Sequence, residues 1–436
     1  MSAGGVERVL RGLATAFQHI PEARGWDITF LLSRFNSAHR RCEWPQSLLA
    51  PNVHVEWIGE HTAPARWLDP LAHAQGIGGI SATKAPGFVM ARAARLFGPL
   101  ALRARLGDPF ATIRKVAERF DVAYFTYPVA MLPPPMRTPV VITPQDFNYR
   151  HFFRPGSRLY RVRERDTRAW LSRAERVLVT TEAVRDELVR YYPEHAHKTS
   201  VVQLGVDVAA ADTPNAADLS SLTQRRSLPS EFALVVGWVM AHKNQLAIVN
   251  AMIRLREQGV RLPVVFVGPN AQNLVERRDF GFREGYAGEV RQALATAGFV
   301  HGRDFFALGY VADAEIRCLY HLATVFILPS LYEGFGLPSL EALQAGCPTI
   351  ISSIPPLQEQ NRLLGGAVPT FDPKDPVTLA DRIAWVVNHR DRAKQLAARA
   401  AARIPDVYDW NKTARAYLGA FEQVVQSGDA RKRALR

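Results

Sequence analysis

Residues 328–348 read LPSLYEGFGLPSLEALQAGCP, and this stretch decides the fold. The apolar run Ala323 to Leu328 predicts a short buried strand that leads into a glycine-rich loop. Pro338 is typical of the first turn of a helix, and Gly346 is typical of its end. Because Pro348 to Ile351 is again extended and apolar, the unit is strand, loop, helix, strand. Ligands bind at the carboxyl ends of such strands, where the N–H groups of a helix N-terminus suit a phosphate.

Two carboxylates flank the loop formed by Gly334, Phe335 and Gly336. Glu333 and Glu341 are eight residues apart, so they do not share a helix face, and we expect them to reach two parts of one extended ligand. A carboxylate accepts two hydrogen bonds from a vicinal diol, which a sugar or a ribose offers. The helix dipole alone accounts for Glu341 as an acidic residue near a helix start, but it does not account for Glu333 together with this loop.

The motif Glu-Gly-Phe-Gly-Leu-Pro-Ser-Leu-Glu-Ala at 333–342 resembles the signature of the retaining glycosyltransferases of family 4. The resemblance implies the GT-B fold, an α/β architecture in which two Rossmann-like domains with parallel sheets face an inter-domain cleft. It implies that Glu333 contacts the donor sugar and that Glu341 contacts the nucleotide ribose. The donor diphosphate would meet the backbone of the loop Gly334, Phe335, Gly336 and Leu337.

Length and composition agree with two globular domains. The chain has 436 residues, of which 47% are hydrophobic and 22% charged. No apolar run approaches the length of about 18 residues that a transmembrane helix needs, and the first residues do not have the pattern of a signal peptide. Cys42, Cys318 and Cys347 are odd in number and lack metal-ligand spacing, which argues against a disulfide framework. We therefore expect a cytoplasmic protein.

The net charge is +13, and the arginines and lysines gather in three sets. The sets are Lys84 to Arg105, Arg158 to Arg176, and the tail Arg431 to Arg436. Solvated helix faces are the most common explanation of such a pattern. Contact with an anionic membrane is the alternative, and it would place the protein peripherally on the inner face of the plasma membrane. Nucleic acid is not an expected partner, because no nucleic-acid-binding motif accompanies the charge.

Gly4 and Gly5 open a predicted helix that runs to about His19. In the family that the chain resembles, such a glycine pair follows the first strand and lies under the donor phosphates. Only three residues precede the pair here, so we expect either a start that is assigned too late or a domain without its first strand. A missing central strand would leave neighbouring backbone groups unpaired, at about 1–3 kcal/mol for each buried group.

The predicted strand Val140 to Thr143 leads to Gln145, where the family often has a histidine near the donor sugar. Glutamine cannot act as a general base, although its amide can hold a sugar hydroxyl. His151 is close in sequence and offers an alternative. An exposed loop histidine without a role in the site is the other interpretation of His151.

A second phosphate site is predicted after the strand Phe232 to Val236. Gly237 follows this strand, and Lys243 stands just before a helix that starts at about Asn244, where it can neutralise diphosphate oxygens. The family's arginine position holds Trp238 instead, so a bidentate phosphate clamp is absent.

The nucleotide base is placed by resemblance alone. Tyr310 and Val311 follow the predicted strand Phe305 to Leu308 and correspond to residues that border the base in the family. The resemblance also divides the chain into an acceptor-binding domain at 1–208, a nucleotide-sugar-binding domain at 209–410, and a helix at 411–436 that returns to the first domain. Residues 208–225 are rich in Asp, Ser, Thr and Asn, and they read as the linker.

The resemblance implies a retaining hexosyltransferase without a cofactor. Because no Asp-x-Asp motif occurs to hold a cation, we expect the reaction to be metal-independent. Its donor would be a GDP- or UDP-linked mannose, glucose or similar sugar, and its acceptor a glycan or lipid-linked glycan of cell-surface polysaccharide synthesis. Glu333, Lys243 and Gln145 are the expected catalytic residues. A GT-B partner protein that binds a nucleotide sugar without transfer remains the main alternative, ahead of a sugar epimerase or a phosphorylase. A Rossmann dehydrogenase is disfavoured because Ser339 stands where the third glycine would be.

Overall fold

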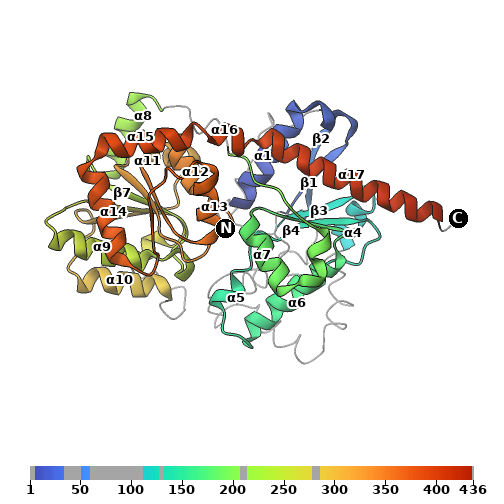
Figure 1. The fold of residues 1–436 in the computed structure, drawn as a ribbon, viewed down its shortest axis with the longest axis horizontal. Coiled ribbons are helices and arrows are strands. Elements are labelled where there is room, and N and C mark those ends of the chain that lie inside the picture. The colour runs from blue at the N-terminus through green and yellow to red at the C-terminus, as the bar shows by residue number, and fades with distance from the viewer. Residues whose placement is uncertain are drawn as a thin grey trace.

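The computed structural model describes residues 5–33, 51–58, 111–126, 132–206, 214–276 and 285–434, which form two lobes (Figure 1). The N-terminal lobe comprises the described residues up to 206 together with the last helix, α17 (Trp410–Ala434), and the C-terminal lobe comprises residues 214–407. All strand pairs among the described residues are parallel. The molecule is therefore α/β with parallel sheets in two lobes, as the sequence predicted.

The C-terminal lobe is built on one six-stranded sheet in the order β12-β11-β10-β7-β8-β9. Its strands are β7 (Ala233–Val236), β8 (Val264–Val267), β9 (Phe305–Gly309), β10 (Val325–Leu328), β11 (Thr349–Ser352) and β12 (Thr370–Phe371). Every residue of β8, β10 and β11 is buried, because helices cover both faces of the sheet. The order reverses between β7 and β10, and such a reversal marks the place where open α/β sheets bind ligands.

The helices of this lobe follow the strands in alternation. They are α8 (Ala216–Arg226), α9 (Gln245–Glu257), α10 (Tyr286–Thr296), α11 (Asp313–Leu322), α12 (Leu337–Gln344), α13 (Pro355–Leu363), α14 (Pro376–Asn388), α15 (Arg390–Ala401) and α16 (Ile404–Val407), with 3₁₀ turns η6 (Ala241–Lys243) and η7 (Ala271–Leu274). Most of the described part of 208–225, the stretch predicted as the linker, forms α8. Asn215 caps this helix by accepting from the backbone N–H of Asp218 at 2.8 Å, and Leu222 is buried beneath it.

Two parallel sheets form the N-terminal lobe. β1 (Ile28–Ser33) pairs with β2 (Val53–Ile58), while β3 (Ala123–Thr126), β4 (Val140–Thr143), β5 (Arg176–Val179) and β6 (Thr199–Val201) pair in chain order. No ladder joins the two sheets within the described ranges, and α1 (Gly5–His19) comes before β1. The remaining elements are η1 (Pro21–Gly25), α4 (Ala111–Ala117), α5 (Tyr149–Phe152), α6 (Arg158–Arg173), α7 (Glu182–Tyr191) and η4 (Pro193–Lys198).

Helix α17 runs along α1 and onward across the N-terminal lobe (Figure 1). The indole of Trp410 lies so close to Gly12 and Gly205 that a Cβ built on either glycine would stand 2.1 or 2.4 Å from it. Further along α17, the hydroxyl of Tyr417 lies 3.3 Å from those of Tyr124 and Thr143. The last helix thus completes the core beside β3 and β4.

The two lobes share one apolar core, which contains Val9 and Val141 from the first lobe and Phe326 and Leu340 from the second. Several features named from the sequence lie outside the described residues: Gly4, Cys42 and the basic set Lys84 to Arg105. Among the described residues, no helix has both the length and the apolar character needed to cross a bilayer.

Candidate active site

The loops that follow β7 and β10 meet at the point where the strand order reverses. Lys243, from the first loop, places its Nζ 2.7 and 2.8 Å from the two carboxylate oxygens of Glu333, from the second. Ser330 donates a further hydrogen bond to Glu333 Oε1 at 2.6 Å. The residue Glu333 is 9% exposed and the Lys243 side chain 22%. Two predicted catalytic residues, distant in sequence, therefore form one nearly buried ion pair.

Asn244 holds the Lys243 loop in place. Its backbone lies in the left-handed region at φ 58°, and its side-chain amide donates to the carbonyls of Pro329 and Pro373 at 3.0 and 2.8 Å. The backbone N–H of Leu331 donates to the carbonyl of His242 at 2.8 Å. These bonds connect the β7 loop directly to the β10 loop, so the ammonium of Lys243 is presented from a fixed backbone.

The signature loop, Gly334 to Leu337, is held in place by packing and by a hydrogen bond. Gly336 has φ 93°, and a Cβ there would lie 2.5 Å from Leu357, so only glycine fits where α12 begins. The side chains of Phe335 and Leu337 are buried, and the hydroxyl of Ser339 donates to the carbonyl of Gly336 at 2.7 Å. Because these side chains are in the core, the loop offers mainly its backbone to a ligand.

Glu341 lies on α12 and has partners different from those of Glu333. Arg8 of α1 donates to its Oε1, and the hydroxyl of Tyr320 donates to its Oε2 at 3.0 Å. Its side chain is 12% exposed. The two glutamates are thus held in separate surroundings by different partners.

Strand ends of the N-terminal lobe contact the signature loop. A Cβ on Gly334 would lie 2.2 Å from the backbone carbonyl oxygen of Gln145, and the hydroxyls of Thr180 and Thr181 donate to the carbonyl of Gly334 at 3.2 and 3.1 Å. The side-chain amide of Gln145 donates to Thr126 Oγ1 at 3.0 Å. Gln145 therefore touches the loop through its backbone, while its amide nitrogen bonds within its own lobe.

Two further titratable groups surround the Lys243–Glu333 pair. Burial raises the pKa of Asp146 to about 6, although a hydrogen bond from the backbone N–H of Asn148 and the charge of Lys243 oppose this shift. Burial, together with the charge of Lys243, lowers the pKa of His242 to about 4. Neither was predicted as a site residue, although Asp146 directly follows Gln145 and His242 directly precedes Lys243.

His151 belongs to an inter-lobe network beside this cluster. One of its ring nitrogens lies 2.6 Å from Glu187 Oε1, and Glu187 also accepts from the hydroxyl of Tyr332, the residue before Glu333. The same Tyr332 hydroxyl accepts from the backbone N–H of Phe147 at 2.9 Å. His151 is therefore an exposed residue of α5 whose ring is paired with Glu187.

The residues predicted for the nucleotide base differ in exposure. Tyr310 is 56% exposed, whereas Val311 is 7% exposed and belongs to the core. The preceding Gly309 has φ 71°, and the side chain of Gln272 fills the space where a Cβ would stand. Tyr310 is therefore the member of this pair that a ligand can reach from the surface.

A carboxylate of the C-terminal lobe caps a helix of the N-terminal lobe. Glu359 on α13 accepts from the backbone N–H groups of Glu182 and Ala183, at the start of α7, at 3.1 and 3.2 Å. Glu359 is 8% exposed. These bonds satisfy two N–H groups that lack a partner inside the helix, and they link the lobes.

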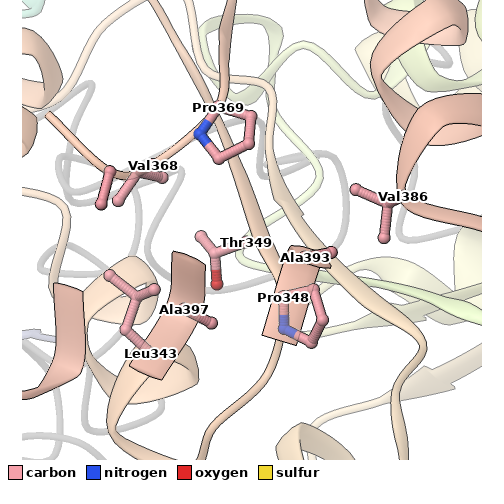
Figure 2. A pocket seen from close by; sticks show the side chains of 9 residues that line it. Leu343, Pro348, Thr349, Val368, Pro369, Val386, Ala393 and Ala397 are labelled. Carbon is pink, nitrogen blue, oxygen red and sulfur yellow. The ribbon is translucent and has the colours of Figure 1, made fainter. Parts of the chain in front are cut away.

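A separate pocket lies in the C-terminal lobe (Figure 2). Its lining comprises Leu343, Pro348, Thr349, Ala367, Val368, Pro369, Val386, Ala393 and Ala397. Leu343 lies in the last turn of α12 and Pro348 directly precedes β11, so the pocket is near the amino end of β11, whereas the signature loop follows the carboxyl end of β10. The hydroxyl of Thr349 already donates to the carbonyl of Cys347 at 2.9 Å, and no charged side chain lines the pocket. It therefore has little to offer a phosphate.

Within the part of the chain that the structure describes, no group of three or more His, Cys, Asp and Glu side chains is placed to hold a metal ion.

Two family models match the chain and together span most of it. The model described as Glycosyltransferase Family 4 matches residues 3–210, and the model described as Glycosyl transferases group 1 matches residues 223–403. The second match includes both loops of the Lys243–Glu333 pair.

Curated relatives share sequence over part of their length. The serotype-specific mannosyltransferase WbdA of Escherichia coli is 27% identical over 262 residues, covering 59% of this chain and 30% of that protein. The glycogen synthase of Mycobacterium tuberculosis is 29% identical over 259 residues, covering 58% of this chain and 56% of the enzyme. The chain thus matches about a third of the length of the WbdA proteins.

Solved structures show the same fold at low identity. HepE of Anabaena, in complex with UDP and glucose, aligns with a TM-score of 0.63 at 16% identity over 97% of both chains. Sucrose-phosphate synthase of Thermosynechococcus elongatus aligns with a TM-score of 0.65 at 17% identity, over 97% of this chain and 94% of that one.

Proposed function

Because this chain belongs to glycosyltransferase family 4 and has the GT-B fold, we propose that it transfers a hexose from a nucleoside-diphosphate sugar to a glycan or lipid-linked acceptor in polysaccharide biosynthesis. The observation that carries the proposal is the Lys243–Glu333 pair at the point where the strand order reverses. A half-buried ammonium beside a helix N-terminus suits a diphosphate, and a buried carboxylate beside it suits sugar hydroxyls.

The donor's two ends would meet different residues. When the donor binds, its diphosphate would replace Glu333 as the ion-pair partner of Lys243. The N–H groups at the start of α12 would donate further hydrogen bonds to the diphosphate. Glu333 would then turn toward the sugar and stabilise positive charge at its anomeric carbon. The ribose would lie at Glu341. This arrangement stabilises the leaving diphosphate through groups already in place, so the proposed reaction needs no metal ion.

The proposed reaction retains the anomeric configuration. The acceptor oxygen approaches the anomeric carbon from the face that the diphosphate leaves. The bond from this carbon to the phosphate oxygen breaks, the bond to the acceptor oxygen forms, and the acceptor's proton passes to the leaving phosphate oxygen. The products are the glycoside and the nucleoside diphosphate. The role of the protein is to hold the two substrates in this geometry.

The donor is proposed to be a UDP- or GDP-linked glucose, mannose or similar sugar. HepE, whose fold this chain shares, was solved with UDP and with UDP-glucose, and the matched relatives include mannosyltransferases. The direct test incubates the protein with UDP-glucose or GDP-mannose and a lipid-linked glycan, with and without EDTA. NMR of the product's anomeric proton then reports the configuration.

We expect transfer with one donor, retention of configuration and no effect of EDTA. Inversion would contradict the mechanism, and loss of activity in EDTA would contradict metal independence. Binding of a nucleotide sugar without transfer to any glycan would favour the alternative of a non-catalytic GT-B partner protein.

We also propose that the protein binds an anionic membrane surface and receives its acceptor there. Leu159 at the start of α6 is 58% exposed, Phe152 is 36% exposed, and the exposed Arg154, Arg158 and Arg161 stand near them in sequence. Exposed apolar side chains among arginines are typical of segments that lie on anionic lipid.

Flotation with vesicles of phosphatidylglycerol and phosphatidylcholine tests this surface. The variant Leu159→Ser with Arg158→Gln and Arg161→Gln should float less than the unchanged protein. The variant Arg390→Gln, which removes an exposed arginine of the other lobe, should float normally. Equal flotation of all three proteins would contradict the membrane proposal.

A further inference from the structure

Arg8 connects the first helix of the chain to the second glutamate of the signature. Its guanidinium donates to Glu341 Oε1 and lies 3.8 Å from Asp313 Oδ1. The side chains of Arg8 and Glu341 are 31% and 12% exposed. Arg8 belongs to the N-terminal lobe, while the other residues belong to the C-terminal lobe, so this is an ion pair between lobes at the edge of the candidate site.

The Glu341 carboxylate has one fixed donor on each oxygen. Arg8 occupies Oε1 and the hydroxyl of Tyr320 occupies Oε2 at 3.0 Å. Because these donors come from α1 and α11, the plane of the carboxylate is set by two elements outside its own helix. A carboxylate oxygen accepts about two hydrogen bonds, so each oxygen keeps one acceptor position for a ligand hydroxyl.

The guanidinium of Arg8 stays protonated, because its pKa is raised above its ordinary value. Burial by itself would lower the pKa of Arg8, but the charge of Glu341, together with Tyr320 and Asp313, outweighs burial and raises it. The guanidinium therefore stays charged, and a charged donor makes a stronger hydrogen bond to Glu341 than a neutral donor would.

We propose that Arg8 is a positioning residue for ribose recognition: it holds the Glu341 carboxylate in the orientation that accepts the two ribose hydroxyls of the donor nucleotide. This inference rests on the proposed function. Arg8 acts through Glu341 and need not touch the nucleotide. Because Arg8 comes from the N-terminal lobe, ribose recognition by Glu341 of the C-terminal lobe depends on contact with α1.

The test asks whether Arg8 matters only when the ribose hydroxyls are present. Titration calorimetry measures the Kd of UDP and GDP, and of their 2′,3′-dideoxy counterparts, for the unchanged protein, Arg8→Gln and Arg8→Lys. Arg390→Gln is the matched control, because Arg390 also pairs with a carboxylate, through two bonds of 2.7 Å to Glu231, but on the exposed surface. The melting temperature of each variant checks that it is folded.

The unchanged protein should bind the ribonucleotide more tightly than the dideoxy analogue by about tenfold or more, as expected for hydrogen bonds to a charged group. Arg8→Gln should remove most of that preference by weakening ribonucleotide binding alone. Arg8→Lys keeps the charge but loses the planar guanidinium, so its preference for the ribonucleotide should lie between those of Arg8→Gln and the unchanged protein. Arg390→Gln should have the same preference as the unchanged protein.

Three results would overturn the inference. Equal weakening of both nucleotides in Arg8→Gln would indicate a general structural role, and tighter ribonucleotide binding would indicate that Arg8 competes with the ribose. A full ribose preference in both Arg8 variants would show that Glu341 needs no orienting arginine. If the unchanged protein bound no nucleotide at all, the proposed function would fail and this inference with it, a result distinct from the other three.

Discussion

Lys243 and Glu333 are the residues on which the proposed chemistry depends most. Each neutralises the other in a nearly buried site, so the loss of one partner leaves the other charge without compensation. This pairing also explains how a lysine and a glutamate can share a small space before a donor arrives.

The first prediction concerns turnover. Glu333→Ala should lower kcat by about 10²–10³ or more, because the developing charge at the sugar loses its nearest carboxylate. Glu231→Gln, which alters an exposed carboxylate paired with Arg390, should leave kcat unchanged. Steady-state kinetics with the preferred donor measures both. Near-normal turnover in Glu333→Ala would remove Glu333 from the mechanism.

The second prediction concerns the pH dependence of the free energy of unfolding, to which Asp146 and His242 contribute with opposite signs. Asp146 has a folded pKa of about 6 against an ordinary 3.8, so the folded protein binds this proton more tightly, and the group lowers the free energy of unfolding as pH rises through that window. His242 has a folded pKa of about 4 against 6.5, so its contribution to the free energy of unfolding rises with pH between these values.

Single substitutions should separate the two contributions. Between pH 4 and 6.5, Asp146→Asn should make the unfolding free energy rise more steeply with pH, and His242→Gln should make it rise less or fall. Urea titrations at several pH values measure the slopes, with the exposed His389→Gln as the control. Identical slopes in Asp146→Asn and the unchanged protein would contradict the assignment.

At the scale of elements, α1 and α17 illustrate how packing overrides helix propensity. Ala normally stabilises a helix interior relative to Gly by about 1 kcal/mol. In α17, Gly419 has open space around it, so Gly419→Ala should stabilise. In α1, a Cβ at Gly12 would stand 2.1 Å from the Trp410 ring, so Gly12→Ala should destabilise by about 1–3 kcal/mol.

Thermal or urea unfolding measures both changes against the unchanged protein. The pair is informative because the same substitution, at a helical glycine in each case, is expected to have opposite signs. Stabilisation by Gly12→Ala would show that α17 does not pack on α1 as described.

Element boundaries could be predicted where sequence periodicity and turn chemistry agree. Val140–Thr143 was predicted as a strand and is a strand with those ends, the predicted strand Phe232–Val236 begins one residue later, and the helix predicted to run to about His19 ends there. Helix α8 was missed because its polar residues have the composition of a loop. Its cap Asn215 could equally belong to a turn, and only the burial of Leu222 in the structure identifies the segment as a helix packed on the core.

The same limit explains which site residues were found. Glu333, Lys243 and Glu341 stand in motifs, and a motif is visible along the chain. The contacts of Arg8, Tyr320, Glu187 and Glu359 join elements far apart in sequence, and nothing along the chain indicates which partner each one meets.

For the whole molecule, the contact between lobes is concentrated around the signature loop. Gly334 lies against Gln145, Glu359 caps α7, and Arg8 reaches Glu341. The residues proposed for the diphosphate, sugar and ribose therefore stand where the lobes touch, and the arrangement of the lobes is part of the site.

Gly334→Ala tests this dependence. Its Cβ would lie 2.2 Å from the backbone of Gln145, so the lobes should be forced apart at the loop while the C-terminal lobe stays folded. We expect turnover to fall by about tenfold or more, because small misplacements in a reacting geometry are costly, while nucleotide affinity changes less. Gly25→Ala, at a glycine with open space, is the control. Unchanged turnover in Gly334→Ala would show that this contact is not needed for transfer.

The most direct test of the central claim is a thermal-shift panel of UDP, GDP, ADP and CDP on the unchanged protein and on Glu341→Ala. A ligand at 100 times its Kd stabilises the folded state by about 2.7 kcal/mol, which is readily measured. We predict that UDP or GDP raises the melting temperature of the unchanged protein and that Glu341→Ala loses most of the shift. No shift with any nucleotide, or an equal shift in Glu341→Ala, would contradict the assignment of the signature loop as the donor site.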